Sequence, residues 1–587
     1  KCQKYKSRLC RQKKTFLLGT LTLKYKIKYY LELLVHILHK GKVPDKYKEV
    51  YKLELKYDNI HQYTVKCSNT SQITLDDDYN VPDSKPDIDS IVKDFGMVVL
   101  DSIRVNQDKA QVEGSLKYAI LYIGKGQEEG SFLPVKMDGS LHFLENINLS
   151  CDASDTEVTC RARIEDLTIK SINSRKISVK AIVSLTVVCE EINNVAISSQ
   201  ITADEECSLQ LLYKDYEYAQ MDVNMRDNLR IKESLSLPNG KADVAELVWD
   251  DVDVKNMSTR MTEDGLSVGG ELSVFIMYIS NDDGQSVQWY ETSVPFTGVI
   301  DVSGADPESI CYVGFTLTGK NVEVRPDYDG NNREIAVELV LDMDIKSYRD
   351  CKKTALKDVY VPGSTMNIKQ SEVKLKKLLI RNNTKCRVAD NIKVADYINL
   401  MQIVNATAGV QIDDYEYTSE GIEVSGAVMV NVCYITSDDN APMGSVNAVI
   451  PFTGVVAIKE YDKDNIEYMI RPCIEQLQAS MNSSAQIEVK AVVSLDAICF
   501  EPVVLSTIEE CEYIPGDGEY YASLPSMVGY ISDGRCNMWD IAKKYNTTCD
   551  AIRRDNALVQ RLSDSDDVPR GTKLLLIKEC MVAETHD

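Results

Sequence analysis

Alternating apolar and polar residues are the clearest pattern in this chain. In the stretch KISVKAIVSLTVVCEE, which begins at Lys176, every second residue from Ile177 to Val187 is apolar. A similar alternation runs from Ile487 to Leu495. A period of two places the apolar side chains on one face of a β-strand and leaves the other face to polar residues. The pattern therefore predicts antiparallel strands that pack as a sandwich.

An internal repeat with a period of 156 residues organises these strands. The stretch VEGSLKYAILYIG from Val112 returns as VGGELSVFIMYIS from Val268 and as VSGAVMVNVCYIT from Val424. A glycine and a tyrosine recur in register within the copies, as Gly114, Gly270 and Gly426 and as Tyr122, Tyr278 and Tyr434. The period far exceeds the roughly 20 to 50 residues of solenoid units, so each copy can bury its own core. We predict three tandem β-sandwich-like domains in a mainly β, multidomain chain.

The recurrent tyrosine and glycine have simple structural interpretations. A tyrosine at the end of a buried strand is better explained by packing than by ligand stacking, and we expect its hydroxyl to reach solvent. The glycines lie outside any phosphate-loop motif, so we expect a bulge or a close approach between strands. The stretches VPFTGVI from Val294 and IPFTGVV from Ile450 predict the start of a strand at Pro-Phe and a turn at Thr-Gly.

The first repeat opens with QITLDDDYNVPDSKPDIDSIVKDFG, and part of this segment recurs. Pro82 and Lys85 return 156 residues later as Pro238 and Lys241, whereas the third copy has Val394 and Tyr397 at these positions. Because the prolines bar a long helix, we predict a short helix over residues 87–96 that closes at Gly96 and lies on a sheet.

Length and pattern together divide the chain into five segments. A chain of 587 residues predicts about four domains of roughly 150 residues each. The predicted segments are a basic N-terminal extension over 1–52, repeats over 53–195, 205–350 and 365–505, and a C-terminal module over 526–580.

Charge is distributed unevenly along the chain. Residues 1–52 contain 15 Lys and Arg against 3 Asp and Glu, whereas the remainder contains 51 against 87. We expect residues 1–52 to be an upstream extension of the reading frame, with the native start near Leu53. The acidic remainder repels nucleic-acid phosphates and anionic lipid. We therefore predict no nucleic-acid partner and no membrane insertion, while a basic protein partner stays open.

Seventeen cysteines, from Cys2 to Cys580, include no CxxC pair and no Cys/His cluster at metal-ligand spacing. This argues against a zinc site. Several, such as Cys433 and Cys499, lie in apolar strand-like stretches, where a reduced cysteine behaves as a small hydrophobic residue. We expect buried free thiols in a reducing cytosol rather than disulfides, and no metal or cofactor.

Few residues suit catalysis. Beyond the N-terminal segment only His61, His142 and His586 remain, so a Ser-His-Asp or Cys-His arrangement has few possible bases. The many carboxylates are expected to be solvated surface groups. We predict no catalytic residues and no enzymatic activity.

The pattern changes after Glu512. IPGDGEYYASLPSM predicts a linker, and a compact module follows it. Asn537 is placed to cap a first helix and Thr548 a second, while Met538 and Ile541 have the spacing of a buried helical face. The strands MVGYIS before and KLLLIK after the helices complete a predicted βααβ unit.

This module resembles LysM, the small βααβ domain of bacterial cell-wall proteins, through WDIAKKYNTT, Ile552, Asn556 and VPRGTKLLLI. It has Arg535 and Cys536 where the family usually has Gly-Asp. The resemblance implies a surface for N-acetylglucosamine polymers such as peptidoglycan, or for a protein. The candidate surface residues are Arg535, Asn537, Lys543, Lys544, Arg553, Arg554 and Asn556. The alternative for the basic residues on the helices is that they are only solvated helix faces.

The three repeats resemble the SPOCS domain of endospore-forming bacteria, through QITLDDDYNVPDSKPDI, the VxGxxxxxxxYI strand and PFTG. Three SPOCS-like repeats followed by one LysM module is similar to the arrangement in a family of spore-coat morphogenetic proteins, over roughly residues 53–580. The resemblance implies a non-enzymatic scaffold in the mother-cell cytoplasm, at the forespore surface. Its partners would be other spore-coat morphogenetic proteins and further copies of itself. The alternative is a peptidoglycan-binding protein of the spore envelope that acts through its LysM domain.

Overall fold

The computed structural model describes most of the chain after residue 50. The described residues are 51–125, 132–154, 156–202, 208–282, 286–304, 306–395, 398–438, 441–459, 461–463, 465–516 and 518–579. The expected N-terminal extension lies almost entirely outside them and stays a prediction. Among the described residues, no helix is both long and apolar enough to cross a lipid bilayer.

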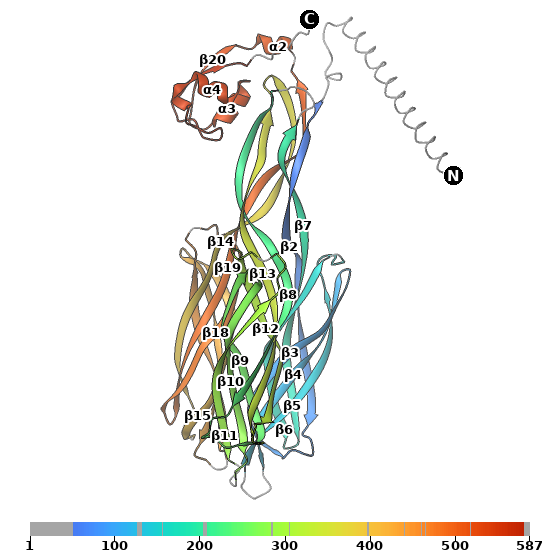
Figure 1. The fold of residues 1–587 in the computed structure, drawn as a ribbon, viewed down its shortest axis with the longest axis vertical. Helices are drawn as coiled ribbons and strands as arrows, with labels where there is room; N and C mark the ends of the chain where they lie inside the picture. Colours follow the sequence, from blue (N-terminus) through green and yellow to red (C-terminus); the bar gives the residue numbers. More distant parts are fainter. Residues whose placement is uncertain are drawn as a thin grey trace, which may run out of the picture.

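Three β-sandwich units stand side by side, as Figure 1 shows. In the described residues each unit has two antiparallel sheets, one built on long strands and one on shorter strands. The long-strand sheets have the orders β2-β7-β6, β8-β13-β12 and β14-β19-β18, the last extended by β1. The shorter sheets have the orders β3-β4-β5, β9-β10-β11 and β15-β16-β17. The mainly β fold predicted from the alternation is confirmed.

The strands of the first unit are β2 (Glu54–Asn80), β3 (Ile88–Asn106), β4 (Lys109–Lys125), β5 (Phe132–Asn148), β6 (Glu157–Asn173) and β7 (Lys176–Thr202). Those of the second are β8 (Gln210–Ser236), β9 (Val244–Thr262), β10 (Gly265–Ser280), β11 (Val287–Ile300), β12 (Ile310–Pro326) and β13 (Asn332–Tyr360). Those of the third are β14 (Ser364–Lys393), β15 (Leu400–Tyr417), β16 (Gly421–Thr436), β17 (Met443–Ala457), β18 (Glu467–Ser483) and β19 (Gln486–Pro515), with β1 (Tyr51–Lys52) beside it.

The helix predicted over residues 87–96 is wrong, because this segment belongs to β3. The ladder between β3 and β4 has register shifts between Ile88 and Ser90 and between Ile91 and Lys93. Each extra residue moves the next side chains to the opposite face of the strand. The bulges therefore space the apolar residues three and four apart, which imitates the pattern of a helix.

The recurrent glycine marks a close approach between strands, as predicted. Gly270 lies opposite Phe296 and Gly426 opposite Phe452 in the ladders. A Cβ atom on Gly270 would lie 2.9 Å from the ring of Phe296, closer than side-chain carbons pack. The glycine of the repeated strand and the phenylalanine of the PFTG motif are therefore two halves of one contact.

The turn predicted at Thr-Gly in the PFTG motif is wrong. Residues 297–298 lie inside β11 and residues 453–454 inside β17, with continuous pairing on both sides. Both strands are at the edge of their sheets, where a proline removes no ladder hydrogen bond. Pro295 and Pro451 therefore fit within these strands and do not start them.

The recurrent tyrosine is a buried packing residue, as predicted, but its hydroxyl does not reach solvent. Tyr122 and Tyr278 have no exposed surface. The Tyr122 hydroxyl donates to the Pro86 carbonyl (3.0 Å) and the Tyr278 hydroxyl to the Ala242 carbonyl (3.1 Å). Burial raises the pKa of Tyr122 to about 12, so the group stays a donor. This bond ties the repeated strand to the proline-containing opening of the unit.

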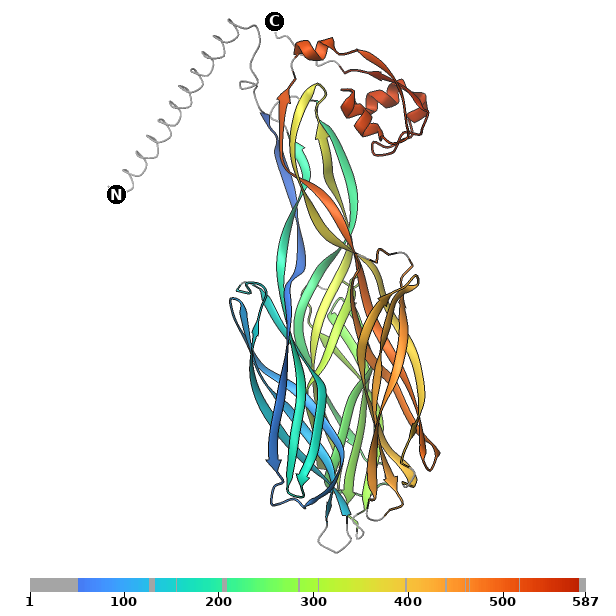
Figure 2. The same cartoon turned by 180° about the vertical axis from the view of Figure 1, so that it is seen from behind.

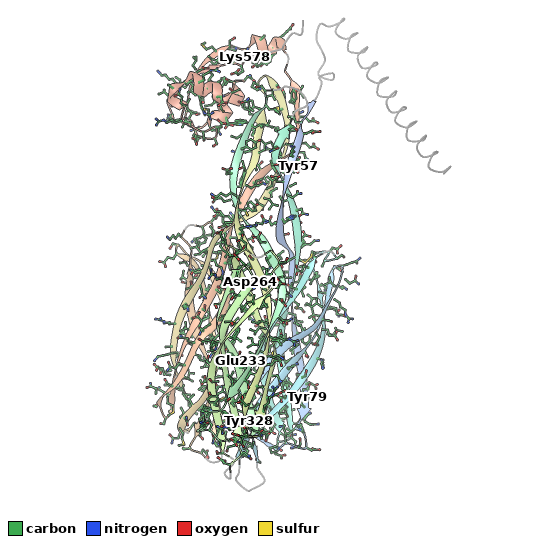
Figure 3. The ribbon with its side chains drawn as sticks, in the orientation of Figure 1. Tyr57, Tyr79, Glu233, Asp264, Tyr328 and Lys578 are labelled. Carbon is green, nitrogen blue, oxygen red and sulfur yellow. A yellow bond between two sulfur atoms is a disulfide. The ribbon has the colours of Figure 1, made fainter. Side chains whose placement is uncertain are left out.

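We expect Tyr278→Phe to lower the free energy of unfolding by about 1 kcal/mol, because the half-buried Ala242 carbonyl loses its hydroxyl donor. Urea unfolding followed by circular dichroism measures the change. Tyr328→Phe is the matched control, because the Tyr328 side chain is fully exposed on a loop (Figure 3). An equal loss in both variants would contradict the assigned role of the Tyr278 hydroxyl.

The period-two stretches form the inner faces of the sandwiches, as predicted. The alternating apolar residues from Ile177 to Val187 on β7 are at most 1% exposed, and those from Ile487 to Leu495 on β19 at most 3%. Each unit has its own apolar core between its two sheets.

A shared apolar cluster lies between the units. On β4, Leu116, Tyr118, Ile120 and Tyr122 face the core of the first unit, while Ala119, Leu121 and Ile123 face outward into this cluster. The second unit contributes Val248, Trp249, Phe275 and Met277, and the third contributes Val404, Cys433 and Met443. The central strands of the shorter sheets are therefore buried on both faces, which explains their nearly continuous apolar sequences.

A buried ionic network accompanies the shared cluster and is centred on β9 of the second unit. Asp250 accepts from Lys136 of the first unit (2.8 Å) and from Lys320 of its own unit (2.7 Å). Asp251 accepts from Lys93 of the first unit (2.7 Å) and also from Asn405 of the third. Burial opposes the charge on Lys136, but Asp250 and Asp138 outweigh it and raise the pKa of Lys136. The network joins all three units.

Three pairs of long strands continue beyond the sandwiches as a stalk. The pairing of β6 with β7 ends at Glu190, and from there to Thr202 β7 pairs with β2 alone. The pairs β8–β13 and β14–β19 extend in the same way, and the three ribbons wind around one another (Figure 2). They share apolar clusters drawn from all three units. Across the stalk, the Tyr57 hydroxyl donates to the Glu509 carbonyl (2.7 Å; Figure 3).

One disulfide corrects the expectation that the cysteines are all free. Cys67 on β2 is bonded to Cys151 in the connection between β5 and β6, 84 residues away. The loop that carries Cys151 follows a strand of the other sheet and lies against β2, so no local motif in the sequence predicts this bond. Eleven other cysteines in the described residues are free thiols, most of them buried as expected.

Candidate functional site

The C-terminal module sits at the tip of the stalk, away from the sandwiches (Figures 1 and 2). Its elements are α2 (Gly518–Ser523), β20 (Met527–Ile531), α3 (Met538–Lys544), α4 (Cys549–Asp555), η2 (Ala557–Val559) and β21 (Lys573–Ile577). The strands β20 and β21 pair antiparallel, so the βααβ order is as predicted. The stretch predicted as a linker contains the short helix α2.

Both predicted helix caps are present. The Asp540 amide donates to the Asn537 side chain (2.8 Å) and the Ala551 amide to the Thr548 hydroxyl (3.1 Å). These bonds satisfy backbone donors that a helix start leaves open. Met538 and Ile541 are buried, as their spacing predicted.

The core of the module continues into the stalk. Leu212 and Tyr360 of the second unit belong to the same apolar cluster as Trp539 and Ile552 of the module. The rings of Tyr360 and Trp539 meet edge to face, with centroids 4.7 Å apart. The Tyr360 hydroxyl donates to the Thr547 carbonyl (2.7 Å), and burial raises the pKa of Tyr360, which keeps it a donor. The module is therefore docked rather than tethered.

Asp358 on β13 is the polar centre of the docking contact. It accepts from the indole Nε1 of Trp539 (2.8 Å) and from the Lys543 ammonium (2.7 Å). A second attachment comes from the Gly363 amide, which donates to the Asn546 side chain (3.2 Å). Within the module, α2 is held to the C-terminal end, where the Tyr521 hydroxyl donates to the Glu579 carbonyl (2.7 Å). Lys578, labelled in Figure 3, donates to the Tyr521 carbonyl (2.6 Å).

Four of the seven predicted site residues have structural roles inside the protein. Asn537 caps α3, and Lys543 bonds Asp358. Arg553 is paired with Asp550 and Asp564. The buried Asn556 side chain donates to the Ile552 and Leu575 carbonyls and accepts from the Leu575 amide. These side chains fix the module and its docking.

The other three predicted site residues are exposed. Arg535 lies in the loop between β20 and α3, and Lys544 ends α3 beside the Tyr545 ring. Arg554 on α4 bonds its neighbour Asp555. They lie on different elements, and the structure does not bring the seven residues together as one polar site.

An apolar face of the β20–β21 sheet was not predicted. Met527 (60% exposed), Ile531 (64%) and Leu575 (38%) point away from the helices. Leu558 on η2 is 78% exposed. The sequence carried a signal for this face, because a two-stranded sheet with helices on one side leaves alternate residues of its strands uncovered. We call Met527, Ile531 and Leu575 the sheet face.

We expect Asp358→Asn to weaken docking of the module by about 1–2 kcal/mol, because the Lys543 ammonium loses a charged acceptor while the indole keeps a neutral one. That energy corresponds to roughly a 5- to 30-fold shift toward the undocked state. Hydrogen exchange of the amides in residues 358–363 and 543–548 measures it. Asp555→Asn, which removes a carboxylate from an ion pair within α4, is the control and should leave this exchange unchanged. Equal exchange in Asp358→Asn and the parent would refute the assigned contact.

Three segments of the chain match the family model described as SipL, SPOCS domain, at residues 87–172, 243–325 and 399–482. No curated protein and no solved structure matches the chain. The chain therefore carries three SPOCS domains, and that resemblance is confirmed. The matched segments run from β3 to β6, from β9 to β12 and from β15 to β18. The strand pairs that build the stalk, and the C-terminal module, lie outside them.

Proposed function

We propose that this protein is a non-enzymatic scaffold for assembly of the spore coat, in the mother cell at the forespore surface. The observation that carries the proposal is the shape: three SPOCS domains form one body, and their long strands hold a small module at the tip of a shared stalk. This arrangement would hold the surface of the C-terminal module at a fixed distance from the surfaces of the three SPOCS domains. The SPOCS matches favour a role in sporulation.

The proposal assigns the C-terminal module, which resembles LysM, to binding a spore-coat protein. Its sheet face is apolar and uncovered, and its neighbour Lys573 adds a positive charge in an acidic protein. Exposed apolar residues grouped on one face are typical of protein-binding surfaces. Four of the polar residues expected to bind glycan are engaged within the protein, which favours a protein partner over peptidoglycan.

A non-enzymatic role agrees with the placement of the described histidines. His61 on β2 and His142 on β5 are both exposed, and His61 contacts Asn194. The recurrent tyrosines are buried by packing, and the hydroxyls of Tyr122 and Tyr278 are engaged in backbone hydrogen bonds. The SPOCS domains would then serve contacts with coat proteins and with further copies of the chain.

Affinity capture from sporulating cells tests the proposal. The baits are the full chain, the variant Ile531→Asp/Leu575→Asp, and the control Val299→Asp/Val449→Asp, which changes apolar residues of similar exposure on the SPOCS domains. We expect the full chain and the control to retain coat proteins that the sheet-face variant loses, and purified partner to bind the full chain directly. Equal capture by all three baits would show that the contacts with coat proteins do not use the sheet face.

The peptidoglycan alternative needs a separate measurement. The full chain is sedimented with insoluble peptidoglycan beside an acidic control protein. Enrichment of the chain alone, reduced in Arg535→Glu and unchanged in the sheet-face variant, would replace the protein-docking proposal with glycan binding. Absence of enrichment would leave protein docking as the function of the module.

A further inference from the structure

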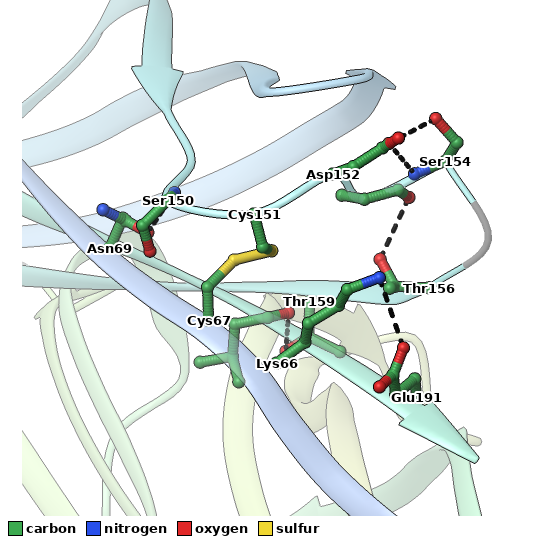
Figure 4. The surroundings of a disulfide bond; sticks show 12 residues. Lys66, Cys67, Asn69, Ser150, Cys151, Asp152, Ser154, Thr156, Thr159 and Glu191 are labelled. Atoms are coloured by element: carbon green, nitrogen blue, oxygen red, sulfur yellow. Dashed lines mark hydrogen bonds and ion pairs between the residues drawn. A yellow bond between two sulfur atoms is a disulfide. The ribbon is translucent and has the colours of Figure 1, made fainter. Parts of the chain in front are cut away.

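Three cysteine sulfurs converge in the first unit. Cys67 and Cys151 form the disulfide in Figure 4, and the free thiol of Cys189 on β7 lies beside it. All three sulfur atoms lie within 4.8 Å of one another. Cys67 and Cys189 are buried, and Cys151 is half-buried.

The backbone holds these cysteines from three sides. Cys67 is directly opposite Cys189 in the ladder of β2 and β7. Cys189 is also opposite Val158, one residue from the point where β6 begins to pair and the stalk begins. The Asn69 side chain accepts from the Ser150 amide and hydroxyl (both 3.2 Å), which fixes the loop just before Cys151.

The SPOCS fold itself does not require this cluster. The three units can be aligned on one shared bond, in which the amide of Val81, Leu237 or Val394 donates to the carbonyl of Arg175, Arg333 or Ala485. In each unit, the residues fourteen positions away from the two bonded residues, one on each strand, face each other in the ladder. These corresponding pairs are Cys67 with Cys189, Val223 with Ser347, and Ile380 with Cys499. The corresponding loops after β11 and β17 contain no cysteine. Of the three units, only the first brings three cysteines together at this position.

We propose that Cys67, Cys151 and Cys189 form a binding site for a thiophilic divalent cation of the zinc type when the disulfide is reduced. Thiolates are the ligands that such cations prefer, and three protein ligands leave a fourth position open. Zinc–sulfur bonds of about 2.3 Å place the sulfurs of a tetrahedral site about 3.8 Å apart. The Cys189 sulfur lies within 4.8 Å of both other sulfurs. The Cys67 and Cys151 sulfurs are bonded to each other, so they must move apart to reach this spacing when the disulfide opens.

The disulfide and the metal site are alternative states, because both use the sulfurs of Cys67 and Cys151. A dithiol reductant opens the disulfide by transferring two electrons and two protons, and its own two thiols become a disulfide. The cation then displaces protons from the three thiols. Either state ties β2 to the loop between β5 and β6, and the metal state adds β7 at the base of the stalk.

Cobalt titration of the full chain tests the proposal. The reduced protein is titrated with Co²⁺ without oxygen, and thiolate-to-cobalt charge-transfer absorption in the near ultraviolet reports the ligands. We expect about one equivalent to bind and Zn²⁺ to displace it. The oxidised chain, with its disulfide intact, should give no such absorption.

Two variants are chosen because other units already carry the new residues at the corresponding positions. Cys189→Ser matches Ser347 and Cys67→Val matches Val223, so both should fold. Each should weaken cobalt binding by more than about tenfold, since a ligand is lost. Cys499→Ser is the control, because this buried thiol stands in the third unit opposite Ile380. No charge-transfer band in the reduced parent, or a band unchanged in Cys189→Ser, would overturn the proposal.

Discussion

Trp539→Ala should unfold the C-terminal module while the three SPOCS domains remain folded. Trp539 is 3% exposed and lies where the module core meets Tyr360 of the stalk. Truncating a buried tryptophan costs about 3–5 kcal/mol. A single core of this size rarely supplies more than about 3–5 kcal/mol. The loss therefore removes all or most of the stability of the module.

Two measurements separate the module from the body. Limited proteolysis should remove the C-terminal segment of Trp539→Ala under conditions in which the parent resists, and the circular dichroism of the β-rich body should stay unchanged. Tyr520→Ala is the control, because that ring is 66% exposed on α2. Resistance of the Trp539→Ala module equal to that of the parent would show that the tryptophan does not hold the module together.

The module shows what local sequence can predict. The cap at Asn537 and the buried face of α3 follow from a few neighbouring residues, and both are observed. The docking contact joins Trp539 to Asp358 and Tyr360, about 180 residues earlier, and no local pattern encodes it. For this reason Lys543 had the features of a surface residue in the sequence and is an internal partner in the structure.

In the three SPOCS domains, too, local sequence predicts the individual strands but not the contacts between distant parts of the chain. A regular alternation predicts a strand, so β7 and β19 could be predicted. Bulges in β3 disrupted the alternation and led to the false helix. The run AILYI on β4 is buried on both faces because the other two units cover its outer side. Its apolar composition is visible in the sequence, but the second covering surface is not.

The cluster of three cysteines could not be predicted from local sequence, because it depends entirely on contacts between residues that are far apart in the chain. Spacing along the chain excluded a metal motif, yet strand register places Cys189 opposite Cys67 and a loop brings in Cys151. At the 156-residue period of the repeat, the positions that correspond to these cysteines in the other two copies carry no cysteine, so comparing the repeats gives no signal. Only the three-dimensional arrangement shows that the three cysteines meet in one unit.

Asp250→Ala should destabilise the whole three-unit body by about 3–5 kcal/mol. Asp250 is 5% exposed and neutralises Lys136 and Lys320, which come from different units. Removing one partner of a buried ion pair is costly because the remaining charge stays in a poorly solvated place. Here Lys320 loses its carboxylate partner and Lys136 keeps only Asp138, 3.7 Å away. Because Asp250 bridges the first and second units, the loss should appear as a lower urea midpoint of the main transition.

A double-mutant cycle distinguishes this network from simple loss of packing. Lys320→Met replaces the lysine with an uncharged side chain of similar length. It therefore removes one of the two positive charges that Asp250 balances. The double variant Asp250→Ala/Lys320→Met should therefore lose less stability than the sum of the single changes. Glu338→Ala, which breaks the exposed pair with Lys232, is the control and should change the midpoint little. Strict additivity of the two buried changes would show that Asp250 acts through its volume and that its ion pairs do not contribute to joining the units.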